Sequence, residues 1–124
     1  PSEAFRALDA GADALKLFPG DGLSPKVVKA LRAVVPKDAL LAVTGGVDAA
    51  NLGDWMTGGA NGVGIGSALY KPGKEIAAVA ADAQRFADAA RRASGGKGLA
   101  KGEGGPSESL AGPRAVASAD ETVG

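Results

Sequence analysis

Short apolar runs alternate along the chain with longer stretches whose apolar residues recur at helical spacing. The short runs are bounded by glycine or proline, which is typical of strands in a parallel sheet. They cover residues 14–18, 40–43 and 62–65. The periodic stretches predict helices over residues 3–10, 25–35, 48–57 and 74–93. One helix followed by three strand–helix units predicts an α/β fold in which helices cover a parallel sheet.

The predicted helices have recognisable start signals. Ser2, Ser24 and Asp48 are residue types that favour the N-cap position, and Pro25 suits the first helical position. The apolar face expected for the last helix consists of Ile76, Val79, Ala80, Ala83, Phe86 and Ala90.

Residues 94–124 differ in composition from the rest of the chain. Glycine, serine, alanine and charged residues dominate there, and aromatic residues are absent. Such a segment cannot bury enough apolar area to offset its ordering entropy, so we expect a disordered tail, with a functional tail as the alternative. Residues 1–93 form the predicted folded domain. The absence of an initiator methionine before Pro1 favours a fragment of a longer protein.

Composition excludes several kinds of chemistry. The 14 basic and 14 acidic residues cancel, which gives no electrostatic basis for binding nucleic acid or an anionic membrane. The sequence contains no cysteine and no histidine, which excludes disulfides, the usual zinc sites and a histidine general base. No apolar run approaches the roughly 20 residues of a membrane span, and no signal-peptide pattern occurs at the start. We therefore expect a soluble, cytoplasmic protein without a metal site.

The first predicted strand contains a lysine, Lys16, between apolar neighbours. Burial of an unpaired ammonium costs several kcal/mol, so a lysine in a buried strand is a candidate for chemistry. Desolvation lowers the pKa of a lysine, and the free amine can attack a carbonyl to form a Schiff base. The alternative is a lysine that points outward or lies on a sheet edge.

Two glycine-rich turns follow the next two strands. Residues 44–46 read Thr-Gly-Gly, and Gly66-Ser67 follows the third strand. Glycines between a strand and a helix allow backbone N–H groups to point at an anion, with a helix N-terminus adding a favourable dipole. In (β/α)8 barrels, the loops after strands seven and eight frequently build such a phosphate site. Glycines required only by the turns themselves are the alternative.

These motifs, in this order and spacing, resemble the C-terminal half of the 2-keto-3-deoxy-6-phosphogluconate and -galactonate aldolase family. Residues 15–19 are similar to the sixth strand of these (β/α)8 TIM barrels, with Lys16 as the Schiff-base residue. Residues 44–47 resemble the phosphate turn after strand seven, and residues 64–73 resemble strand eight with its phosphate-binding Ser67. The resemblance covers residues 1–93 and implies about three βα units of the barrel.

The resemblance implies a class I aldolase that needs no metal or organic cofactor. Its partners would be a phosphorylated keto-deoxy sugar acid, pyruvate and glyceraldehyde 3-phosphate, and the full-length protein would be a homotrimer. Lys16 would form the imine with the substrate ketone. The phosphate would lie on Gly45, Gly46, Gly66 and Ser67. The substrate pocket would include Phe18, which would keep Lys16 dry, together with Pro19 and Thr44.

The resemblance also implies that parts of the site are missing. The glutamate that transfers protons and the residues that bind the pyruvyl carboxylate lie on strands one to three of the family's barrel. Three strands cannot close a barrel, so we expect exposed apolar surface and little turnover from this chain alone. Thr44 is the candidate for choosing the C4 epimer, and the choice between galactonate and gluconate stays open. Another phosphate-binding (β/α)8 enzyme and a non-catalytic sugar-phosphate-binding module are the alternatives.

Overall fold

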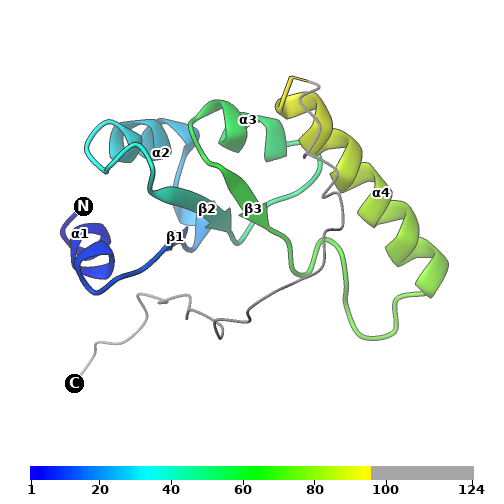
Figure 1. Cartoon of the computed structure of the whole chain (residues 1–124). Helices are drawn as coiled ribbons and strands as arrows, with labels where there is room; N and C mark the ends of the chain where they lie inside the picture. Colours follow the sequence, from blue (N-terminus) through cyan, green and yellow to red (C-terminus); the bar gives the residue numbers. More distant parts are fainter. Residues whose placement is uncertain (96–124) are drawn as a thin grey trace, which may run out of the picture.

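The structure is a computed structural model that describes residues 1–95 (Figure 1). Its elements are α1 (Ser2–Asp9), β1 (Ala14–Leu17), the 3-10 turn η1 (Gly20–Gly22), α2 (Pro25–Arg32), β2 (Leu40–Thr44), α3 (Leu52–Thr57), β3 (Gly62–Gly64) and α4 (Ile76–Ala93). The predicted order of one helix and three strand–helix units is confirmed. Of the predicted disordered tail, residues 96–124 lie outside the described part.

The three strands form one parallel sheet in the order β1-β2-β3. Lys16 of β1 is paired in register with Ala42 of β2, and Thr44 of β2 is paired with Gly64 of β3. Side chains of register partners point to the same face of a sheet, and neighbours along a strand point to opposite faces. The register therefore sets which side chains share a face with Lys16.

One face of the sheet forms the core. Leu15, Leu41 and Val43 are buried on it, together with Val28 of α2 and Trp55 of α3. Helices α2 and α3 lie on the same side of the sheet (Figure 1). Burial of a large aliphatic side chain contributes about 1.5–3 kcal/mol, so this single layer of contacts is the main source of stability.

The other face of the sheet is open. Lys16 is exposed there, and Leu40 is 49% exposed. Helices cover only one side of the sheet in the described part (Figure 1). The prediction that three strands leave apolar surface exposed is confirmed.

A polar network joins the strands at the end opposite the glycine-rich turns. The Asn61 N–H donates to the Leu41 carbonyl (2.8 Å), and Asn61 Oδ1 accepts from the Leu41 N–H (2.9 Å). Arg32 of α2 donates to Asn61 Oδ1 and to the Ala39 carbonyl, both at 2.7 Å. The network ties α2 to the start of β2 and β3.

Two helices begin later than the sequence predicts. Asp48 does not cap α3. Its Oδ1 instead accepts from the N–H groups of Ala50 and Asn51 in the turn that precedes the helix. Helix α4 begins at Ile76 and not at Lys74, because the turn at 72–73 and two further residues come first. Ser2 is the first residue of α1, with Pro1 at the N-cap position.

Helix α4 packs against α3 (Figure 1), and its buried face differs from the apolar face predicted. Phe86 and Ala89 are buried, as is the acidic Asp82, whereas Ile76 is 87% exposed. On the opposite face, a hydrogen bond from Arg91 holds the pKa of the exposed Asp88 carboxyl below its usual value of 3.8.

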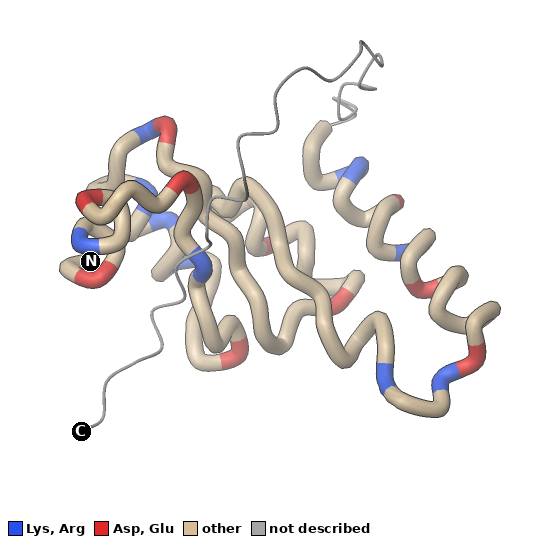
Figure 2. Tube along the Cα trace, turned by 60° about the horizontal axis from the view of Figure 1, so that its bottom comes forward, with Lys and Arg blue, Asp and Glu red and all other residues tan. Residues whose placement is uncertain are grey.

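Charged residues of both signs are scattered over the described chain (Figure 2). Basic and acidic residues alternate in position and gather on no single face in that view. None of the helices within residues 1–95 is long and apolar enough to span a bilayer.

Candidate active site

The predicted site residues come from segments that follow the three strands or end them. Phe18 and Pro19 follow β1, Gly45 follows β2 and Gly66 follows β3. Because the strands are parallel and adjacent, their carboxyl ends meet at one edge of the sheet. The predicted residues are thereby brought to the same end of the molecule.

A cavity of about 490 Å³ lies at this edge. Six of the eight predicted site residues line it, namely Phe18, Thr44, Gly45, Gly46, Gly66 and Ser67. Its remaining lining residues are Val47, Asp48, Gly64, Ala68 and Lys71. We call this space the glycine cavity. It unites the two glycine-rich turns, as the sequence predicts.

The fold itself requires the glycines of the first turn. Gly45 and Gly46 have φ angles of +88° and +67°, a region that other residues rarely adopt. A Cβ added at Gly45 would lie 3.1 Å from the Phe18 ring, and one at Gly46 would lie 2.8 Å from the Asp21 Cβ. The turn therefore packs directly on the loop that follows β1. The structural explanation of these two glycines is sufficient by itself.

The loop after β1 depends on a glycine that the sequence analysis did not single out. A Cβ at the buried Gly20 would lie only 2.4 Å from the Gly45 carbonyl oxygen. Gly20 thus lets the backbone of η1 approach the first glycine turn. The Phe18–Pro19 peptide bond before it is cis.

The second glycine turn is different. A Cβ at Gly66 would meet no atom of the described chain within 4 Å, and its φ is not in the left-handed region. The side chain of the exposed Ser67 makes no hydrogen bond within residues 1–95. Neither local backbone geometry nor packing requires a glycine at 66. The position is open space on the wall of the cavity.

Neither turn lies at a helix N-terminus, contrary to the prediction. Helix α3 starts only at Leu52 and α4 only at Ile76, so a turn of irregular backbone separates each helix from its glycines. The Asn51 side chain bridges part of the first gap by donating to the Gly46 carbonyl (2.8 Å). The polar side chains that line the cavity are those of Thr44, Asp48, Ser67 and Lys71.

Lys16 lies beside the glycine cavity and does not line it. It lines a neighbouring groove of about 680 Å³ together with Phe18, Pro19 and apolar residues of α2. Its Nζ lies 5.2 Å from the centroid of the Phe18 ring, which is within cation–π range. Phe18 borders both spaces, so one ring connects the lysine to the glycine cavity.

Of the two alternatives for Lys16, the described part of the chain shows the outward-pointing one. Its side chain is exposed on the open face of the sheet, and Phe18 is itself 61% exposed. Phe18 therefore does not keep the lysine dry in the described part. The physical reason is that no chain segment within residues 1–95 covers this face, so water reaches the ammonium.

Thr44 points to the open face and packs against β3. Its Oγ1 lies 3.0 Å from the position that a Cβ at Gly64 would take. Gly64 thus leaves room for the Thr44 hydroxyl at the edge of the glycine cavity. A larger side chain at 64 would displace that hydroxyl.

The sequence analysis missed the role of two charged residues at the cavity. Lys71 and Asp48 are its charged lining residues. The Asp48 carboxylate is engaged by the N–H groups of its own turn, whereas Lys71 makes no ion pair within the described chain. Lys71 lies only four residues beyond Ser67 in the sequence, and this short separation was the signal that could have placed it at the same cavity. Residues 1–95 contain no group of three acidic side chains arranged to hold a metal ion.

The chain is similar to known proteins in sequence and in fold. No family model matches the chain. Two curated relatives are the 2-dehydro-3-deoxy-6-phosphogalactonate aldolase of Escherichia coli K12, 45% identical over 92 residues, and a probable enzyme of the same name from Rhizobium meliloti 1021, 47% identical over 73 residues. The matches cover 74% and 59% of this chain but 45% and 34% of the relatives.

Two solved structures share the fold. One is described as a native KDPGal structure, with a TM-score of 0.74, and the other as a cube-shaped, porous cage designed by fusing symmetric oligomeric domains, with a TM-score of 0.73. Both are 44% identical and cover 76% of this chain, which covers 46% and 35% of theirs respectively. In sequence and in its partial barrel fold, the chain resembles the 2-keto-3-deoxy-6-phosphogalactonate and -phosphogluconate aldolases, and it spans less than half the length of the curated relatives that it matches.

Proposed function

We propose that this chain is part of an aldolase that cleaves 2-dehydro-3-deoxy-6-phosphogalactonate to pyruvate and glyceraldehyde 3-phosphate. The observation that carries the proposal is the placement of Lys16 and the glycine cavity on either side of Phe18 at one end of the sheet. We choose the galactonate substrate because both curated relatives carry that name. The gluconate epimer is the competing substrate.

The reaction begins at Lys16. Its neutral amine adds to the C2 ketone, and loss of water gives an iminium that withdraws electrons from C3. Removal of the C4 hydroxyl proton forms the aldehyde as the C3–C4 bond breaks, and the bonding electrons pass into an enamine. Protonation at C3 and hydrolysis then release pyruvate and restore Lys16. The base for the C4 proton would come from outside the described part.

The glycine cavity would hold the substrate phosphate. Turn N–H groups around Gly45, Gly46 and Gly66 and the Ser67 hydroxyl supply donors, and Lys71 supplies positive charge. Binding energy from the phosphate, which does not react, positions the carbonyl end at Lys16. Thr44 would meet a hydroxyl of the sugar acid and influence which C4 epimer reacts.

The catalytic unit would be larger than this chain. Lys16 is exposed, and no segment within residues 1–95 covers it. Further strands closing a (β/α)8 barrel would cover the open face and desolvate Lys16. We therefore propose that this chain by itself has little turnover.

We further propose a cytoplasmic homotrimer for the complete protein. Its assembly is consistent with the designed cage that shares this fold and is built from symmetric oligomeric domains. Sedimentation equilibrium of the complete protein would give a mass of three chains, and a monomer would contradict the proposal.

Reductive trapping with pyruvate and borohydride tests the proposed chemistry. In the complete protein, peptide mass spectrometry should find one reduced pyruvyl adduct, confined to Lys16. The exposed Lys26 on α2 serves as the internal control, because nonspecific reductive alkylation would label it too. In the isolated chain, labelling at Lys16 should fall to the level of Lys26.

The Lys16→Arg variant should lose the adduct and the cleavage activity, whereas Lys26→Arg should retain both. A complete, folded protein without an adduct at Lys16 would contradict the aldolase. Retained phosphate binding would then favour another phosphate-binding (β/α)8 enzyme if sugar phosphates are turned over, and a binding module if they are not.

A further inference from the structure

The segment that carries Ser67 into the glycine cavity is a single tight turn. The N–H groups of Leu69 and Tyr70 both donate to the Gly66 carbonyl, at 2.9 and 3.1 Å. The loop from β3 to α4 is largely exposed to solvent. Its exposed residues include Ser67, Ala68 and Lys71. The turn therefore needs a support from elsewhere to hold Ser67 in one place.

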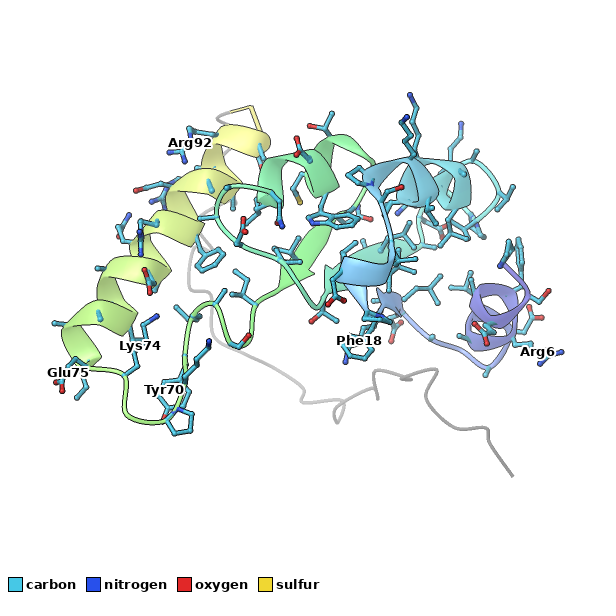
Figure 3. The ribbon with its side chains drawn as sticks, turned by 180° about the vertical axis from the view of Figure 1, so that it is seen from behind. Arg6, Phe18, Tyr70, Lys74, Glu75 and Arg92 are labelled. Carbon is cyan, nitrogen blue, oxygen red and sulfur yellow. The ribbon has the colours of Figure 1, made fainter. Side chains whose placement is uncertain are left out.

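Lys74 provides a contact from outside the turn. Its Nζ donates to the Leu69 carbonyl (2.8 Å) and to Asp82 Oδ2 of α4. The Lys74 side chain is 22% exposed and the Asp82 side chain 12%, so water screens the pair only weakly. Figure 3 shows Lys74 between the loop that carries Tyr70 and helix α4. We call this connection the Lys74–Asp82 strut.

The strut explains an acid on the packed face of α4. Asp82 is buried among residues such as Phe86 that pack against the core, and Arg85 forms a second ion pair with it. Burial of an ion pair brings little net stability compared with apolar residues of similar size. The lysine partner of Asp82 also binds the backbone of the turn. The buried acid is therefore better explained by its effect on the position of that turn than by its contribution to stability.

We propose that Lys74, oriented by Asp82, is a positioning residue that sets the Gly66–Leu69 turn and thereby places Ser67 for phosphate binding. The proposal rests on the proposed function for the role of Ser67 and goes beyond it in assigning the source of its placement. Lys74 itself does not line the glycine cavity, so it acts through the turn.

Arg85 offers a matched control. It pairs with the same carboxylate, yet its side chain is 72% exposed, and within residues 1–95 it makes no hydrogen bond or ion pair with the turn. Lys74→Met removes the strut, and Arg85→Met removes an ion pair of Asp82 while leaving the strut in place. Asp82→Asn keeps an oxygen acceptor for Lys74 and removes the charge.

The experiment uses the full chain, labelled with ¹⁵N and titrated with inorganic phosphate. In wild type, the amide signals of Gly66 and Ser67 should shift and saturate. In Lys74→Met, the Leu69 and Tyr70 amides should exchange faster with solvent, and the phosphate dissociation constant should rise about tenfold, as expected for the lost bond from a charged group. Arg85→Met should match wild type in both measurements.

Asp82→Asn guards against loss of folding in Lys74→Met and should give an intermediate rise, about threefold, in the dissociation constant. Equal exchange and equal affinity in wild type and either strut variant would overturn the proposal, as would an effect of the same size in Arg85→Met. If wild type itself bound no phosphate, the proposed phosphate site would fail. The exchange of Leu69 and Tyr70 would still decide whether the strut sets the turn.

Discussion

At the residue scale, Gly66 and Gly46 line the same cavity for different physical reasons. A side chain at Gly46 would collide with the loop that follows β1 and would force a left-handed backbone on a residue that resists it. A methyl group at Gly66 would enter empty space. The fold requires a glycine at 46, whereas it leaves position 66 free to serve a ligand.

Substitution by alanine separates these two roles. Gly66→Ala should change the free energy of unfolding by less than about 0.5 kcal/mol and weaken phosphate binding about tenfold, because the methyl group blocks the approach to a backbone N–H. Gly46→Ala should destabilise the chain by at least about 1 kcal/mol. Urea denaturation and phosphate titration of both variants measure the two effects. A large loss of stability in Gly66→Ala would show that the fold also requires this glycine.

At the scale of elements, Asn61 extends the pairing of β3 with β2 by one residue before β3 begins. Its backbone and side chain exchange two hydrogen bonds with Leu41, and Arg32 of α2 joins the same oxygen. This network fixes β3 against β2 at the end away from the site. The position of the glycine cavity depends on that register, because β3 has only three residues.

Asn61→Ala should destabilise the chain by about 1–3 kcal/mol, because the Leu41 N–H and the Arg32 guanidinium each lose an acceptor. Gln84→Ala on the exposed side of α4 is the control and should stay within about 0.5 kcal/mol of wild type. Chemical denaturation followed by Trp55 fluorescence measures both. Equal stability of the two variants would show that water replaces the Asn61 contacts.

The elements also show how far sequence reasoning extends. Apolar runs, glycines and prolines predicted the order of elements, the parallel sheet and the meeting of the two glycine-rich turns, because these depend on local pattern and on parallel strands. Phe18 and Thr44 were expected at the cavity only from the family resemblance. The start of α4 was not predicted because a turn at 72–73 delays the helix. The burial of Asp82 was not predicted because folding brings the loop residue Lys74 to it. The sequence left the exposure of Lys16 open, because burial in a barrel depends on segments beyond the three strands.

At the scale of the molecule, the sheet is covered on one side only. Leu40 and Phe18 are exposed, and the edges of β1 and β3 lack neighbours within the described chain. Open strand edges beside apolar side chains favour pairing with other chains. We therefore expect the isolated chain to self-associate.

Leu40→Lys should reduce this self-association, because it places a charge on the open face at the start of the central strand. Ile76→Lys is the control, since Ile76 is 87% exposed at the start of α4 and lies outside the sheet. Sedimentation velocity over a range of protein concentrations measures the effect. A larger effect of Ile76→Lys would place the contact on α4 instead of the sheet.

Phe18 borders both the lysine groove and the glycine cavity, and this has a consequence for selectivity. Under the proposed function, a substrate that engages both ends would lie across this ring, and the ring would set the distance between its carbonyl carbon and its phosphorus atom. Homologous keto acids with one carbon fewer or one carbon more between these two groups would reach only one end at a time. The ring would then reject them by length, whatever the configuration of their hydroxyl groups.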